Sequence, residues 1–218
     1  MVTSLGYKIL YIGFLSTITC FLALASDNNP LQDFCVAEAN SPGGGAICKD
    51  PETVNENDFF TTGLHKAANT SNSLGSYITR INVARIPGLN TLGVSLARAD
   101  FAPLGTNAPH IHPRASEIVT VIEGTLQVGF VTSGPEYRHI TKVLNRGDVF
   151  VFPQGLVHYN QNIGNGSAVA IVGFNSQNPG TVAVANAVFG AKPHISAYNL
   201  AKSFQINEDM VSELQARF

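Results

Sequence analysis

The chain has 218 residues, of which 44% are hydrophobic and only 13% are charged, with 20 glycines and 11 prolines. A chain of this length can bury the core of one domain, and the composition favours a turn-rich β protein over a helical or disordered one. The formal net charge is −2, and no basic run interleaved with aromatic residues occurs, so nucleic-acid binding has no support.

The first 25 residues have the pattern of a secretory signal peptide. Lys8 precedes an apolar run from Ile9 to Ala25 that ends in Ala-Leu-Ala, the small-x-small pattern of a signal-peptidase site. The competing interpretation is a transmembrane anchor, but a run of about 17 residues with three hydroxyl side chains is marginal for crossing a bilayer. No basic cluster follows it. We therefore expect removal of residues 1–25 and a secreted mature protein, residues 26–218, without a membrane anchor.

The mature chain retains two of the three cysteines, Cys35 and Cys48. An even pair in an oxidising compartment predicts one disulfide rather than two free thiols. The bridge would close a loop of about 13 residues, which the chain-entropy estimate values at about 3 kcal/mol.

Two N-x-S/T sequons, at Asn69 and Asn165, are candidate glycosylation sites. Asn69 lies in a polar run that is typical of an exposed loop. Asn165 lies in a tight Gly-Asn-Gly turn and is the weaker candidate.

The pattern along the chain predicts an all-β domain. Prolines and glycines in residues 26–75 predict an irregular N-terminal extension that the disulfide closes. From about residue 76 to 190, short apolar or alternating segments between turn residues predict an antiparallel sandwich or barrel without α/β alternation. Glu123-Gly124 predicts a hairpin turn between two of its strands. The candidate strands are residues 76–86, 91–101, 117–124, 125–131, 139–145, 148–153 and 168–175.

The last stretch, about residues 195–218, changes to a helical period and predicts a short C-terminal helical segment. Asn207 or Asp209 is available as its N-cap. We expect the apolar stripe of this helix to pack on the barrel or on a partner subunit. The stripe consists of Val211, Leu214 and Phe218.

Two histidines one residue apart, His110 and His112, are followed five positions later by Glu117. Side chains at positions i and i+2 of a strand point to the same face, so both imidazoles can bind one ion. Glu117 adds an oxygen donor where the next strand begins. The three residues therefore predict part of a metal site.

A fourth ligand has to come from another strand, and His158 is the candidate. It follows an apolar strand that ends at Pro153 and a turn at Gly155, so it faces either the barrel interior or solvent. Asn107 could direct a neutral amide to the same space. The remaining histidines match no ligand position and are interpreted as surface or packing residues: His65, His139 and His194.

These spacings resemble the two conserved motifs of the cupin family. The first motif is carried by His110, His112, Glu117 and Gly124. Over its mature length the chain is similar to plant germin-like proteins, in segments such as GLHKAANTS, NTLGVSLARADFAP, TNAPHIHPRA and FNSQNPG. The second motif is carried by Gly147, Pro153, Gly155, His158 and Asn162.

The resemblance implies a jelly-roll β-barrel that binds manganese and assembles as a hexamer, a trimer of dimers. It assigns the metal ligands to His110, His112, Glu117 and His158, and it places the cysteine pair where germins have a disulfide. The donor chemistry is compatible with manganese, iron or zinc, and an octahedral ion would keep two positions open for a small-molecule substrate. A structural zinc site would instead be closed, tetrahedral and rich in thiolates. The choice of manganese rests on the resemblance.

Two activities recur among germins, oxalate oxidase and superoxide dismutase. In true germins two asparagines near the metal are thought to orient oxalate; one matches Asn107, and the other falls at Ala97, where the amide is missing. Losing a hydrogen bond to a buried charged ligand costs about 1.5–3 kcal/mol. Dismutation needs only an open position, a redox metal and a proton source, so it is our leading hypothesis. Leu104 stands where germins commonly have glycine, and we expect a narrower or differently shaped approach to the metal.

Non-enzymatic roles stay open as alternatives. One is a receptor-like or storage cupin that binds a small apolar or auxin-like ligand, and another is a cell-wall glycoprotein that the metal stabilises. All four ligands are retained in a single barrel, which weighs against storage. The resemblance also implies an extracellular location, in the apoplast or cell wall, and a role in plant defence or wall modification.

Overall fold

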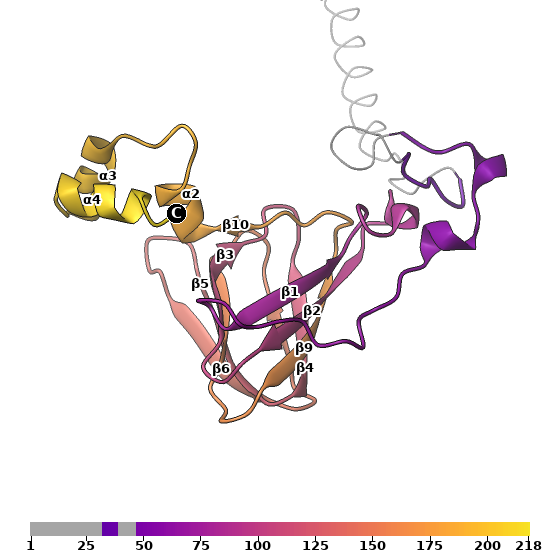
Figure 1. The fold of residues 1–218 in the computed structure, drawn as a ribbon, viewed down its shortest axis with the longest axis horizontal. Helices are drawn as coiled ribbons and strands as arrows, with labels where there is room; N and C mark the ends of the chain where they lie inside the picture. The colour runs from indigo at the N-terminus through magenta and orange to yellow at the C-terminus, as the bar shows by residue number, and fades with distance from the viewer. Residues whose placement is uncertain (1–31, 39–46) are drawn as a thin grey trace, which may run out of the picture. The chain divides into compact units, whose positions relative to one another are not determined.

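The computed structural model describes residues 32–38 and 47–218. The predicted signal peptide, residues 1–25, lies outside the described residues. The described part from Phe34 onward is built on two five-stranded antiparallel sheets (Figure 1). Among the described residues, no helix is both long enough and apolar enough to span a membrane.

The two sheets form the antiparallel barrel that the sequence pattern predicts, with the jelly-roll architecture that the resemblance to cupins implies. One sheet has the strand order β1-β2-β9-β4-β7 and the other has the order β10-β3-β8-β5-β6, so most neighbours in space are not neighbours in sequence. The strands are β1 (Ser76–Ile81), β2 (Ser95–Phe101), β3 (Thr106–Ile111), β4 (Glu117–Glu123), β5 (Thr125–Val131), β6 (His139–Asn145), β7 (Val149–Phe152), β8 (His158–Asn162), β9 (Ala168–Phe174) and β10 (Val182–Ala183).

The core fills the space between the inner faces of the two sheets. Because successive side chains of a strand point to opposite faces, every second residue contributes to it. In β4, for example, Val119 and Val121 are buried whereas Ile118 and Ile122 are exposed. The buried members of this core are Ala97, Ala99, Phe101, Val119, Val121, Leu126, Val128, Leu144, Phe152, Ala168, Ala170 and Val172.

The predicted hairpin at Glu123-Gly124 is wrong. Strands β4 and β5, on either side of it, do not pair with each other; β4 pairs with β7 and β9, whereas β5 pairs with β6 and β8. A bulge between Val121 and Glu123 shifts the register of β4 against β9, and bulges bend the strand that carries them. Gly124 then adopts a φ of +82°, and a Cβ there would lie 2.6 Å from that of Ala168. The turn therefore carries the chain from one sheet to the other.

Strands β3, β8 and β10 are absent from the sequence-based set of strands. Strand β8 reads HYNQN and has little apolar content, and β3 contains Pro109. Both strands lie inside the second sheet, where pairing with a strand on each side outweighs their weak intrinsic β-propensity. These two strands carry two of the four predicted metal ligands, His110 and His158, and His112 directly follows β3.

The N-terminal extension is held by the predicted disulfide, which joins Cys35 and Cys48. A short antiparallel bridge pairs Ala37 with Cys48, and the amide of Asn90 donates a hydrogen bond to the Cys35 sulfur. Three short 3-10 helices complete the extension and the loop after β1: η1 (Pro51–Thr53), η2 (Glu56–Phe59) and η3 (Pro87–Leu89).

The C-terminal segment contains three helices, α2 (Val184–Phe189), α3 (Ala197–Phe204) and α4 (Glu208–Gln215). Of the two candidate N-caps, Asn207 caps α4 by accepting a hydrogen bond from the Met210 amide, whereas Asp209 lies in the first turn. Val211 of α4 is fully buried, and it packs with Leu200 of α3 in a small helical cluster rather than on the barrel. Helix α2 contacts β3 and β10 and so connects this cluster to the second sheet.

Candidate metal centre

A bulge in β3 brings three functional side chains to the inner face of the barrel. Asn107 pairs with Asn160 of β8, and His110 pairs with His158, so three steps along β3 correspond to two along β8. In a regular strand, residues three apart point to opposite faces. The extra residue in the bulge turns Asn107 to the same face as His110. His112, two residues further along, lines one cavity together with them. Pro109 is tolerated because it lies within this bulge.

The other two candidate ligands are the first residues of their strands. Glu117 begins β4 in the first sheet, and His158 begins β8 in the second. The His158 ring stacks on Phe152, with 4.7 Å between centroids and 26° between planes. This packing limits rotation of the imidazole, so the core helps to fix the direction of the ligand.

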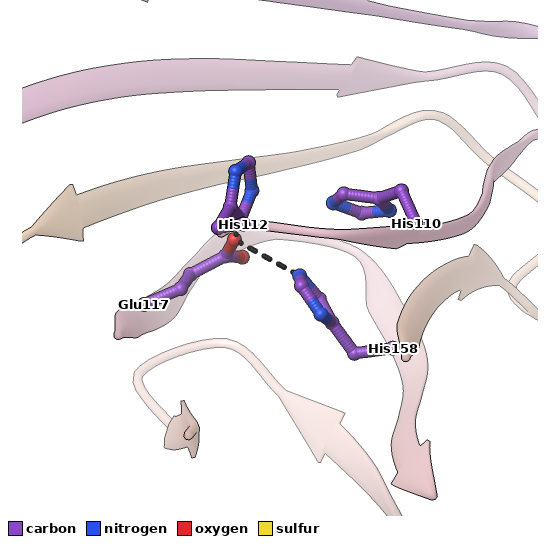
Figure 2. A group of neighbouring side chains, drawn as sticks. All are labelled: His110, His112, Glu117 and His158. Atoms are coloured by element: carbon purple, nitrogen blue, oxygen red, sulfur yellow. Dashed lines mark hydrogen bonds and ion pairs between the residues drawn. The ribbon is translucent and has the colours of Figure 1, made fainter. Parts of the chain in front are cut away.

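Figure 2 shows the four side chains turned toward a common space. One ligand atom of each residue lies within 4.8 Å of the others. The Nε2 atoms of His112 and His158 lie 3.0 Å and 3.3 Å from Oε2 of Glu117. All four residues are between 2% and 6% exposed. The structure thus brings together His110, His112, Glu117 and His158, as the sequence spacing predicts.

Each of the three histidines has its Nδ1 atom bound to a backbone carbonyl. His110 Nδ1 lies 2.8 Å from the Ala108 oxygen, His158 Nδ1 lies 2.8 Å from the Leu156 oxygen, and His112 Nδ1 contacts the Gly180 oxygen. A carbonyl can only accept, so each Nδ1 carries the proton. With Nδ1 held outward, Nε2 is the ring atom left to bind an ion, in the tautomer that outer hydrogen bonds commonly fix in metal sites. A bound cation would replace the Nε2 contacts of His112 and His158 with Glu117.

Arg114 anchors the backbone just before the Gly180 carbonyl that contacts His112. The backbone amide of Arg114 donates to the Pro179 oxygen, and its Nε donates to the Asn178 oxygen at 2.9 Å. Gly180 has a φ of +69°, and a Cβ there would lie 2.8 Å from Nη2 of Arg114. Only glycine fits this turn without displacing the guanidinium. The segment Asn178–Gly180 is thus shaped to place one carbonyl against one imidazole.

Burial and the neighbouring groups set the protonation of the site. Burial, together with the charge of His158, lowers the pKa of His110 to about 4, so this imidazole is neutral near pH 7. Burial raises the pKa of Glu117, but hydrogen bonds from His112 and His158 outweigh this effect and lower it to about 2. Neutral imidazole and ionised carboxylate are the forms that bind metal.

The centre opens into a cavity of about 290 Å³ between the two sheets. His110, His112 and Glu117 line it together with Asn107 and Asn160. The Asn160 Oδ1 atom is buried, and no hydrogen-bond partner for it lies in the described part of the chain. An unsatisfied buried amide oxygen costs about 1–3 kcal/mol. A small ligand that donates a hydrogen bond to Asn160 Oδ1 would remove this cost.

Taken together, the donor set fits a first-row metal ion. Three imidazole nitrogens and one carboxylate oxygen suit Mn²⁺, Fe²⁺ or Zn²⁺, and an octahedral ion held by these four donors would have two further positions for ligands. In the metal-binding forms, neutral imidazole and ionised carboxylate, the four side chains together would carry a net charge of −1 in the barrel interior. A bound cation would compensate this buried charge, which is otherwise costly.

The structure places Leu104 away from this cavity, which corrects the expectation that it narrows the approach to the metal. Leu104 lies in the loop between β2 and β3, at the far end of β3 from the histidines, and it is 73% exposed. Its φ is +61°, a conformation that glycine adopts without strain. The glycine preference at this position therefore has a backbone explanation.

The remaining predicted residues are at the surface. Both sequon asparagines, Asn69 and Asn165, are exposed, as are His65 and His194. His139 is exposed as well and contacts the Tyr159 hydroxyl at 3.1 Å. None of these histidines belongs to the group around Glu117.

Sequence reasoning missed Asn160, Gly180 and Arg114. Asn160 stands two residues after His158, so the period of two in a strand could have placed it on the same face. Gly180 contacts His112 across 68 positions, and no local pattern indicates such a contact.

Comparison with known proteins agrees with this architecture. The cupin family model matches residues 62–212. Germin-like protein 8-2 from Oryza sativa subsp. japonica is 52% identical over 99% of this chain and 99% of its own length. Germin-like protein subfamily 1 member 7 from Arabidopsis thaliana is 54% identical over 95% of each chain. A structure of oxalate oxidase with the substrate analogue glycolate superposes with a TM-score of 0.82 at 43% identity, covering 88% of this chain and 98% of that one.

A two-sheet barrel with a buried cluster of three histidines and a glutamate defines a cupin with a candidate metal centre. The chain belongs to the cupin family and, within it, to the germin-like proteins.

The outer contact to His112 gives a graded test of the metal centre. Gly180→Ala should displace the carbonyl and weaken metal affinity about 10- to 100-fold, the usual effect of losing an outer hydrogen bond. His112→Ala should abolish metal retention. Both are measured by elemental analysis and by competition with a chelator.

Gly147→Ala is the matched control, because Gly147 also has a positive φ of +90° but no atom within 4 Å of a Cβ there. Full metal content in His112→Ala, or equal affinity in the two glycine variants, would contradict the proposed ligand geometry.

Proposed function

We propose that this protein is a secreted, manganese-binding germin-like protein with superoxide dismutase activity. The observation that carries the proposal is the buried group of His110, His112, Glu117 and His158 beside an accessible cavity. A manganese ion held there would supply one-electron redox chemistry with open coordination positions. The overall reaction converts two superoxide ions and two protons into dioxygen and hydrogen peroxide.

The chain's own residues provide what a small oxygen anion requires. The carbonyl contacts orient the imidazoles, and the barrel core excludes water from their outer sides. Asn107 and Asn160 line the cavity from adjacent strands and offer amide groups to a small ligand. Such amides can hydrogen-bond superoxide without the precise two-ended recognition that oxalate needs.

Oxalate oxidase is the second candidate, because a solved oxalate oxidase is 43% identical to this chain. Ala97 argues against it. Its side chain lines the cavity and is 1% exposed, yet it offers no hydrogen-bond donor where true germins have an asparagine. The missing bond to a charged ligand is worth about 1.5–3 kcal/mol, which favours the smaller and less demanding substrate.

Several observations support an extracellular location. The predicted signal sequence, the Cys35–Cys48 disulfide and two exposed sequons are all typical of secreted proteins. We therefore propose the apoplast or cell wall as the location, and a role in defence or wall modification. A non-enzymatic role as a receptor-type or wall cupin stabilised by its metal is the alternative if activity is absent.

An exposed apolar surface supports assembly into a homo-oligomer, which we propose to be a hexamer. Ile118 and Ile122 of β4 and Val149 and Val151 of β7 are each between 47% and 55% exposed. Ile118 lies directly opposite Val151, and β7 is an edge strand. A cluster of this kind at a sheet edge is typical of a subunit interface.

Removal of the metal tests the proposed activity directly. The natively secreted protein should accelerate superoxide decay in proportion to its manganese content, lose this activity with a chelator and regain it on reloading. A manganese-replete protein with superoxide decay at the uncatalysed rate would overturn the proposal and favour the non-enzymatic role.

Replacing the missing amide tests the distinction from oxalate oxidase. Ala97→Asn should gain measurable hydrogen peroxide release from oxalate and dioxygen, because the cavity has room for the amide. Ala97→Leu is the control, since it adds similar volume without a donor. If neither variant releases peroxide, the missing amide is not what excludes oxalate.

A charge on the edge strand tests the assembly. Val151→Lys should lower the oligomer mass measured by light scattering, because an unpaired charge would be buried in the interface. Val143→Lys on β6, at a site that is 43% exposed in the other sheet, is the control. A monomeric wild-type protein, or an unchanged mass for Val151→Lys, would contradict the proposed interface.

A further inference from the structure

The register between β1 and β2 places Arg80 beside the metal cavity. Arg80 lies directly opposite Ala97, and paired residues of adjacent strands point to the same side of a sheet. Ala97 faces the cavity, and Arg80 is also one of the residues that line it. Arg80 and Ala97 therefore lie on the same wall of the cavity. Ala97 offers no hydrogen-bond donor there, whereas the Arg80 guanidinium does.

Arg80 lies toward the solvent side of this wall. Along β1 and just beyond it, Ile78, Arg80 and Asn82 occupy alternate positions and all line the cavity. Ile78 packs against the barrel core, whereas Arg80 is exposed. The side chain thus connects the cavity with solvent and lies where an entering ligand would meet it.

Within residues 32–38 and 47–218, the Arg80 guanidinium forms no ion pair and no side-chain hydrogen bond. Arg98, on the neighbouring strand, is different. The Nη2 atom of Arg98 lies 2.7 Å from Asp100 Oδ1, and its Nη1 donates to the Leu64 carbonyl. Asp100 therefore compensates the charge of Arg98. The Arg80 donors are available to a ligand.

The charges around the cavity favour an anion. Among the described residues that line it, Glu117 is the one carboxylate, and that group contacts His112 and His158. Other polar residues of the lining, such as Asn82, Asn178 and Thr181, are neutral. A fixed cation at the entrance of a low-dielectric cavity raises the local concentration of anions, although the whole chain carries a net charge of −2.

We propose that Arg80 is the anion-recognition residue of this cavity. Its planar donor pair attracts a small oxyanion or carboxylate at the entrance and orients it toward the group formed by His110, His112 and Glu117. The identification of the anion as superoxide rests on the proposed function, whereas the preference for a small anion rests on Arg80 and the cavity alone. Arg80 thereby determines which ligands enter rather than what reaction follows.

Azide is a suitable probe, because it is a small anion that binds metals without turnover. Its affinity for the manganese-loaded protein is measured by calorimetry and by the manganese electron paramagnetic resonance signal, at low and high ionic strength. Arg80→Gln should weaken azide binding about tenfold or more and reduce its salt dependence, since a charged hydrogen bond and a fixed charge are both lost. Arg80→Lys should restore the salt dependence but only part of the affinity, because lysine keeps the charge without the planar donor pair.

Arg146→Gln is the matched control, because it removes the same charge from an exposed residue in the turn between β6 and β7. It should bind azide as the wild type does. Manganese content should be equal in all four proteins, which separates anion recognition from damage to the metal centre.

Unchanged azide affinity in Arg80→Gln, or an equal loss in Arg146→Gln, would overturn the inference. Dismutase activity is scored separately. A wild-type protein without dismutase activity whose azide binding still depends on Arg80 would refute the proposed function and support the anion site.

Discussion

The metal centre depends on three backbone carbonyls that bind the Nδ1 atoms of His110, His112 and His158. Free histidines can present either ring nitrogen, but these contacts fix the tautomer and direct every Nε2 atom inward. Because the rings are also buried, they cannot rotate outward to solvent. The barrel therefore holds three imidazole nitrogens and one carboxylate close together, a donor set that suits a metal cation.

The fold supplies these carbonyls from three different kinds of local structure. Ala108 belongs to the bulge in β3, Leu156 to the turn between β7 and β8, and Gly180 to the segment before β10. Each carbonyl is held by its own surroundings, most clearly at Gly180, where Arg114 anchors the neighbouring backbone. The geometry of the ligands is thus a property of the whole two-sheet barrel rather than of the short H-x-H motif.

Local patterns in the sequence predicted much of this structure, and non-local contacts account for most of what they missed. The alternating strands, a cap at Asn207 or Asp209 and the grouping of the four candidate ligands could be predicted because each depends on spacing along the chain. The corner at Gly124 was mistaken for a hairpin because a positive-φ glycine fits both kinds of turn. The polar strand β8 has no apolar pattern, and the position of Arg80 opposite Ala97 depends on pairing between strands.

Local and non-local features also inform function differently. The spacing of the candidate ligands along the chain indicates a metal, whereas Ala97, Asn160 and Arg80 affect which ligand can approach that metal. These three residues come together only in the folded barrel. An anomalous difference map from crystals of the natively secreted protein would show whether the four side chains hold one metal ion. We expect one peak per chain, coordinated by the three Nε2 atoms and a Glu117 oxygen. Coordination through Nδ1, or a metal bound elsewhere with this group empty, would contradict the proposed metal centre.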